Sequence, residues 1–200
     1  MSIYLLQGLA LGFAAAVQPG PFIVYLVTET LTHGFRKTWV LAFAPLISDG
    51  PIIALALVVL SQMPAWLMNG LNLMSGIFIL YLALGAYRQW RDFTALDVQE
   101  PAARQSVFRA ALMNALNPMP YIYWSLVTGP ILIAGWRQSP MLGLTFIISF
   151  YSMLIGALVV ILALFSAARN LGNQVSRALL GISVVALAGF GLFQIIRGWL

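Results

Sequence analysis

The chain has 200 residues, of which 62% are hydrophobic and 8% are charged. Soluble domains carry about 25% charged residues, so this composition excludes a water-soluble globular protein and indicates one all-α membrane domain over residues 1–200, with about six spans. The chain has no cysteine, which excludes thiol redox chemistry and thiolate metal sites, and its net charge of +5 is interpreted as setting membrane orientation rather than as nucleic-acid binding.

The first expected span covers residues 3–28 and contains a break. Residues 1–28 hold no charged side chain, and such a run is long enough to cross a bilayer as a helix. The motif Gln18-Pro19-Gly20-Pro21 interrupts this run, because each proline lacks an N–H and crowds the preceding turn. Backbone groups freed in this way are tolerated in a membrane only where they are buried in protein or face water. The sequence therefore predicts a broken helix beside a water-filled site.

The first span is also expected to pack closely against another helix and to end in a loop. Gly8 and Gly12 form a GxxxG pair, and small residues at this spacing let two helices approach closely. Residues 29–37 carry several charges, so we predict a loop there. His33, the only histidine, lies in this stretch and is interpreted as solvated rather than as a metal ligand.

The second expected span, residues 38–60, carries a single acid near its middle. A carboxylate at the centre of a bilayer costs about 2.5–3.5 kcal/mol on insertion scales, so Asp49 should face the protein interior. An intramembrane acid is by default a functional candidate; the alternative is a structural acid that bonds a neighbouring helix. Pro45 and Pro51 flank it and predict a distorted helix.

The third expected span covers residues 66–87 and leads into a polar linker. Asn69, Asn72 and Gly76 recur at helical spacing and would line one face, although Asn69 is interpreted as an interfacial residue. Residues 88–109 mix both charges with a proline, which is typical of a solvated linker.

The fourth expected span, residues 110–134, repeats the break of the first. Asn117-Pro118-Met119-Pro120 lies 99 positions after Gln18-Pro19-Gly20-Pro21, and an amide side chain precedes the first proline in both. Proline-interrupted spans at matching positions of two halves indicate a transporter site. The alternative is an ordinary proline kink in each helix. Tyr121 follows the second break, where it would stack on a substrate or, as the favoured interpretation, pack the bundle.

Residues 141–166 and 178–198 complete six expected spans. Each half contains three of them, so the second half crosses the membrane in the opposite sense to the first. The sequence thus predicts a 3+3 inverted repeat with broken helices 1 and 4, in which residues 1–87 form the first repeat and residues 110–200 the second.

Lysine and arginine gather on one side of this predicted bundle. The basic residues of that side are Arg36, Lys37, Arg88, Arg91, Arg104, Arg109, Arg169 and Arg177. The opposite side has Arg137 and Arg197. Because basic loops remain in the cytoplasm, both termini are expected at the periplasmic or extracellular face of a bacterial inner membrane.

Four motifs together resemble the lysine-exporter (LysE/RhtB) family of small bacterial amino-acid exporters, over nearly the whole chain. They are Pro19-Gly20-Pro21, Ser48-Asp49, the run Gly76…Tyr81-Leu82-Ala83-Leu84-Gly85, and Asn114…Asn117-Pro118. The chain departs from the family pattern at Ser48, where glycine is usual, and at Met119, where lysine is usual. The resemblance implies a secondary exporter that needs no cofactor.

We therefore expect export of amino acids or similar small zwitterions by proton or cation antiport. Asp49 would exchange a proton or pair with the amino group of the substrate. A helix N-terminus freed at a break would face the substrate carboxylate. The candidate substrate-binding or coupling residues are Asp49, Gln18, Pro19, Gly20, Pro21, Asn114, Asn117, Pro118 and Tyr121.

Other functions stay open. Relatives in the superfamily handle metals, and Asp49 with amide and carbonyl oxygens would suit Mg²⁺, Ca²⁺ or Mn²⁺. A membrane enzyme is not expected, because one acid without a partner offers little to catalysis. A helper subunit of a larger assembly is a further alternative. The expected partners are the lipid bilayer and a small-molecule substrate, and a homodimer is one possible oligomeric state.

Overall fold

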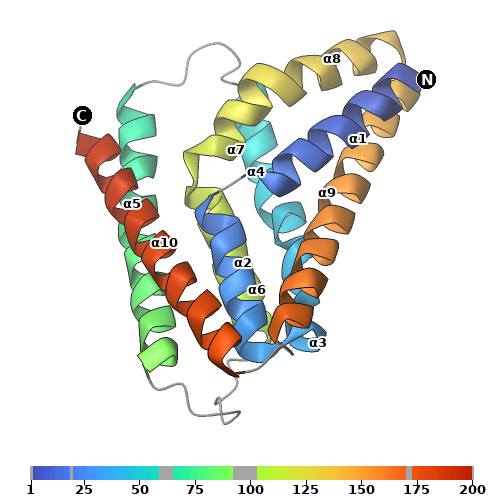
Figure 1. Ribbon diagram of the computed structural model, residues 1–200. Coiled ribbons are helices and arrows are strands. Elements are labelled where there is room, and N and C mark those ends of the chain that lie inside the picture. Colours follow the sequence, from blue (N-terminus) through green and yellow to red (C-terminus); the bar gives the residue numbers. More distant parts are fainter. Residues whose placement is uncertain (1, 19, 59–64, 92–102, 170–172, 200) are drawn as a thin grey trace.

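The computed structural model describes residues 2–18, 20–58, 65–91, 103–169 and 173–199, and all the regular structure in these ranges is helical (Figure 1). The elements are α1 (Ser2–Val17), α2 (Pro21–His33), α3 (Phe35–Thr38), the 3-10 helix η1 (Trp39–Phe43), α4 (Ala44–Val58), α5 (Ala65–Arg91), α6 (Ala103–Leu116), α7 (Pro118–Tyr123), the π-helix η2 (Trp124–Thr128), α8 (Gly129–Gln138), α9 (Pro140–Arg169) and α10 (Asn173–Trp199). The predicted all-α class is confirmed for this part of the chain.

Several helices are long and apolar enough to cross a membrane. Within the described ranges these are Phe35–Leu55, Pro140–Ala168 and Arg177–Trp199, and the bent pair α1–α2 makes a fourth if it is counted as one span. The predicted third and fourth spans correspond to α5 and to α6–α8, which are not among these stretches. The six-span count therefore stays a prediction.

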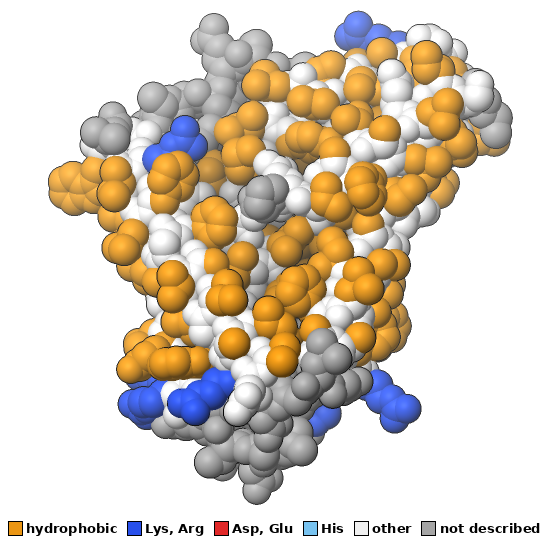
Figure 2. Space-filling view, in the orientation of Figure 1, with side chains coloured by type: hydrophobic (Ala, Val, Ile, Leu, Met, Phe, Trp, Pro, Cys, Tyr) orange, Lys and Arg blue, Asp and Glu red, His pale blue; other side chains and the backbone are white. Residues whose placement is uncertain are grey.

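Apolar side chains cover the outside of the bundle. Ile148, Val160 and Leu164 on α9, and Ile182 and Val185 on α10, are each more than half exposed. Figure 2 shows hydrophobic side chains over the middle of one face, with most of the visible lysines and arginines at the lower end. Such a surface would be costly in water and suits contact with lipid. The chain is a multi-pass membrane protein.

Two long helix pairs form the sides of the bundle. α1 packs along α9, and α5 packs along α10 (Figure 1). A Cβ built on Gly8 would lie 2.6 Å from the carbonyl oxygen of Phe146, and one on Gly76 would lie 2.8 Å from that of Gly191. No side chain fits at these distances, so the helix backbones touch. The close approach predicted for the glycine pair of α1 is confirmed.

The two broken helices meet between these pairs. α2 and α6 run through the centre of the bundle, and α4 packs against α6 (Figure 1). The start of α1 and the end of α10 lie at the same end of the bundle, in the upper part of Figure 1. This arrangement brings the break between α1 and α2 next to the break between α6 and α7.

The predicted loop over residues 29–37 is wrong, because α2 continues through most of it. Glu29 and His33 lie one helical turn apart in α2, with His33 Nδ1 3.3 Å from Glu29 Oε2, and their side chains are 8% and 7% exposed. The histidine is therefore buried rather than solvated. The contact between these two polar side chains permits their burial within the helix, which ends where Gly34 adopts a positive φ of 81°.

The stretch predicted as linker, residues 88–109, is partly helical. α5 continues to Arg91 and α6 begins at Ala103, while residues 92–102 lie outside the described ranges. Arg88 and Arg109 line a cavity of about 150 Å³ together with Glu29, so the buried acid lies near two cations at this end of the bundle.

Candidate functional site

The chain is broken at both predicted positions, and after each break a new helix begins at a proline. α1 ends at Val17 and α2 begins at Pro21, with Gly20 extended between them (φ −177°, ψ 172°) and an angle of 67° between the two helices. α6 ends at Leu116 and α7 begins at Pro118. Proline is well suited to the first turn of a helix, where its missing N–H would have no partner in any case. The same local chemistry therefore produces both restarts.

The amide side chain before the second break is a helix cap. Asn117 has an extended backbone (φ −71°, ψ 126°), and its Oδ1 accepts a hydrogen bond from the N–H of Met119 at 3.1 Å. Its own N–H donates to the carbonyl of Met113 at 3.1 Å, which closes the end of α6. At the first break Gly20 provides no side-chain cap for α2.

Asp49 lies on α4, where the predicted distortion takes a specific form. The helix is continuous through Pro51, and the irregular part is the 3-10 helix η1 that precedes Pro45. Proline 45 cannot donate to the carbonyl four residues earlier, which explains the tighter winding there. The side chain of Asp49 is 4% exposed, as expected for an acid that faces the protein interior.

Both oxygens of the Asp49 carboxylate accept hydrogen bonds from the second half of the chain. Nδ2 of Asn114 donates to Oδ1 at 2.8 Å, and the hydroxyl of Tyr151 donates to Oδ2 at 2.9 Å. Nδ2 of Asn114 also lies 2.8 Å from Oγ of Ser48. Donors of this kind stabilise an ionised carboxylate in a buried site. α4, α6 and α9 are thereby joined at the acid.

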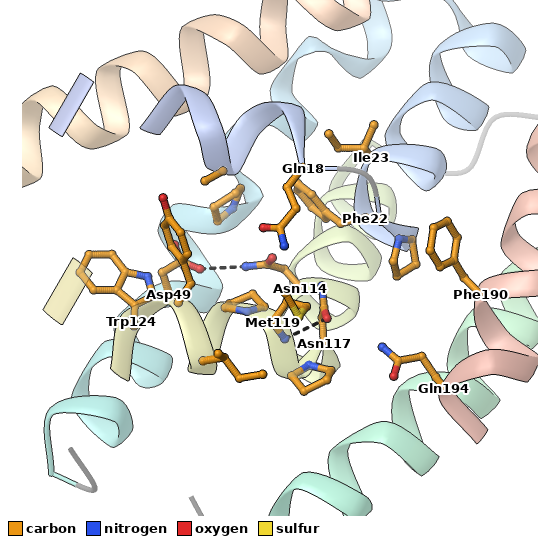
Figure 3. A pocket seen from close by; sticks show the side chains of 18 of the residues that line it. Gln18, Phe22, Ile23, Asp49, Asn114, Asn117, Met119, Trp124, Phe190 and Gln194 are labelled. Atoms are coloured by element: carbon orange, nitrogen blue, oxygen red, sulfur yellow. Dashed lines mark hydrogen bonds between the residues drawn. The ribbon is translucent and has the colours of Figure 1, made fainter. Parts of the chain in front are cut away.

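A π-helical turn borders the same acid. η2 begins at Trp124, whose side chain is 2% exposed and lies beside Asp49 in Figure 3. The hydroxyl of Thr128 donates to the carbonyl of Tyr123 at 3.1 Å and satisfies one of the groups that the irregular turn leaves free. Single π-helical turns are rare and occur mostly at functional sites. No sequence signal identified this turn.

A cavity of about 490 Å³ lies between the two breaks and reaches the Asp49 carboxylate. Figure 3 shows Asp49 on one side of it and Gln194 on the other, with Gln18, Asn114 and Asn117 between them. Aromatic rings, among them Phe22 and Phe190, form much of the remaining wall. Its size and its mixed lining are typical of small-molecule sites.

Most of the candidate residues from the sequence line this cavity. The lining includes Asp49, Gln18, Gly20, Pro21, Asn114, Asn117 and Pro118. Tyr121 is not part of it, since its hydroxyl donates to the carbonyl of Ala115 at 2.7 Å, in agreement with the packing interpretation. Pro19 lies outside the described residues.

Several lining residues were not predicted. Asn69 and Asn72 on α5 both line the cavity, in agreement with the alternative in which they share one face. Gln194 and Arg197 on α10 also line it. A glutamine within an apolar span was a usable signal, because a polar side chain in a membrane needs a partner or water.

The described residues hold no group of three or more His, Asp or Glu side chains that could bind a metal ion. The hard oxygen atoms at the cavity come instead from one carboxylate and several amides.

A comparison with protein families shows which family the chain belongs to. The model of the LysE type translocator family matches residues 13–198, nearly the whole chain. The chain belongs to the LysE type translocator family. No curated protein and no solved structure matches it. Membership in LysE confirms the resemblance seen in the motifs, and it makes the chain a member of a family of membrane transporters rather than of enzymes.

Proposed function

We propose that this LysE protein exports amino acids or similar small zwitterionic metabolites by proton or cation antiport. One observation carries the proposal: Asp49, the one carboxylate among the described residues that line the cavity, lies where two broken helices meet. A buried acid that can gain and lose a proton beside a substrate cavity is the usual means of coupling transport to an ion gradient.

Asp49 has two roles in this proposal. When ionised, it attracts the ammonium group of the substrate, and when it binds a proton it releases that group. Asn114 and Tyr151 hold the carboxylate in place through both oxygens. The Asp49 carboxylate then cannot hold a proton and the ammonium group of the substrate at the same time. This mutual exclusion is the requirement for antiport.

The fold supports alternating access. We infer that α5 and α6–α8 complete six spans, so that the two halves of the chain cross the inner membrane of a bacterium in opposite senses. The arginine-rich end of the bundle, where α5 ends and α6 begins, then faces the cytoplasm. Rocking of the inverted halves around the fixed site would expose the cavity to either side.

Transport by inside-out membrane vesicles tests the proposal. Vesicles that contain the protein are energised to an acidic interior and offered each of the twenty common L-amino acids, and parallel samples receive Mg²⁺, Ca²⁺ or Mn²⁺. We expect uptake of at least one amino acid above that of control vesicles, abolished by a protonophore. Uptake of a metal ion without any amino acid would instead establish the cation exporter, and uptake of neither would contradict both.

A further inference from the structure

Two charged side chains line the central cavity among the described residues, and their charges are opposite. Asp49 projects from α4, and Arg197 comes from the end of α10. The other lining residues are neutral, including Met119 next to the second break. The cavity is therefore acidic at one end and basic at the other, a distribution that suits a ligand with both charges.

The basic end also contains buried amides without partners. Gln194 is 7% exposed, and Figure 3 shows its side chain pointing from α10 into the cavity. Within the described ranges no hydrogen bond uses its amide. Asn72 also lines the cavity, from α5, the helix that packs along α10; it is 5% exposed, and its Oδ1 is buried without a hydrogen-bond partner. Buried polar residues nearly always have hydrogen-bond partners, so the Gln194 amide, which turns into the cavity without a protein partner, points to a ligand.

Arg197 lies on the same face of α10 as Gln194, because residues three apart in a helix are neighbours. Its guanidinium lies 5.3 Å from the centre of the Phe193 ring, a cation–π contact that fixes the side chain without using its N–H groups. It makes no ion pair with any acid in the part of the chain that is described. A guanidinium presents paired N–H donors that match a carboxylate.

We propose that Gln194 and Arg197 bind the carboxylate of the substrate. This inference rests on the proposed function and specifies it: the carboxylate lies at the α5–α10 end of the cavity, and a substrate that reaches Asp49 at the same time carries its ammonium group several ångströms from that carboxylate. Ligands that carry both charges are then preferred over amines and over plain carboxylic acids. The N-terminus of α2 is the rival carboxylate site.

Binding to the purified protein in lipid nanodiscs tests this assignment. The twenty L-amino acids are titrated by calorimetry, and the tightest binder is compared with its α-amide, which lacks the carboxylate charge. Arg197→Gln should lower the affinity for the amino acid by about ten- to a hundredfold, since one charge-assisted pair is lost. It should change the affinity for the amide by less than about twofold. Arg197→Lys should restore part of the affinity. Arg137→Gln, at an exposed position of α8 on the same end of the bundle, should change neither affinity.

Gln194→Glu gives a second test that does not depend on the arginine. A carboxylate at this position should lower the affinity for the amino acid and raise the affinity for the positively charged amide. The variant would then bind the amide more tightly than the amino acid. If both variants weaken the two ligands equally, or leave both unchanged, the subsite is overturned while amino-acid export stands, and the start of α2 becomes the carboxylate site. If no amino acid binds the wild-type protein, this inference and the proposed function both fall.

Discussion

Nδ2 of Asn114 donates a hydrogen bond to Oδ1 of Asp49 across 2.8 Å, and this bond joins the two halves of the chain. Asp49 belongs to the second expected span and Asn114 to the fourth, which breaks three residues later at Asn117. The position of the acid is thus tied directly to a broken helix. A movement of α6 relative to α4 would change the environment of the carboxylate, as a coupled transporter requires.

Removal of the Asn114 amide should impair both stability and export. In Asn114→Leu the buried Asp49 loses one of its donors and keeps Tyr151 and Trp124 beside it, and an unsatisfied buried acceptor costs about 1–3 kcal/mol. We expect a lower melting temperature in detergent and slower export in vesicles. Gln138→Leu is the matched control, because it removes another hydrogen bond between the halves, 2.8 Å to the hydroxyl of Tyr4, outside the cavity. Equal loss of export in the two variants would contradict a specific role for Asn114.

The contact between α1 and α9 should not tolerate one methyl group at Gly12. A Cβ there would lie 3.1 Å from the carbonyl carbon of Phe150 and 3.2 Å from the nitrogen of Leu154, both of them backbone atoms. Gly12→Ala should therefore cost about 1–3 kcal/mol through overpacking. Gly156→Ala on α9 adds its methyl to open space and should be neutral or slightly stabilising. Thermal unfolding of both variants in detergent measures the difference, and similar melting temperatures would refute the close packing.

The capping role of Asn117 predicts which substitutions the second break accepts. Asn117→Ala removes the acceptor for the N–H of Met119 and should cost about 1 kcal/mol, whereas Asn117→Ser keeps a good cap and should cost less. Melting temperatures of the two variants check the order. A serine variant no more stable than the alanine variant would show that the cap contributes nothing.

The orientation of the bundle can be measured by labelling, since the chain has no native cysteine to remove. We expect Ser2→Cys to react with a membrane-impermeant maleimide on intact spheroplasts. Arg36→Cys, at the basic end, should react only after the membrane is opened. The reverse pattern would place the termini in the cytoplasm and contradict the assignment made from the arginines.

Much of the site follows from local chemistry, which is why the sequence could predict it. Pro21 and Pro118 suit the first turn of a new helix because each lacks an N–H, and an acid at position 49 of an apolar span should face the protein interior. Their mutual contact depends on tertiary structure. The prediction that they meet came from matching positions in the two halves, and the cavity between the breaks agrees with it.

Other features could not be predicted, because they depend on partners distant in the chain. The charges of Glu29 and His33 suggested a loop, yet pairing within α2 permits their burial. Asn69 faces the cavity only because α5 is held against α10 through glycine contacts. The π-helical turn at Trp124 has no local signature at all.

Export by the Asp49→Asn variant tests the central claim most directly. Inside-out vesicles with equal amounts of wild-type and variant protein, of matched melting temperature, are offered the amino acid that the wild type transports best, and the initial rate of uptake and the accompanying proton release are recorded. The account predicts that the variant loses proton-coupled uptake while Asp49→Glu keeps a measurable rate. Uptake by Asp49→Asn at the wild-type rate, with protons still released, would contradict it.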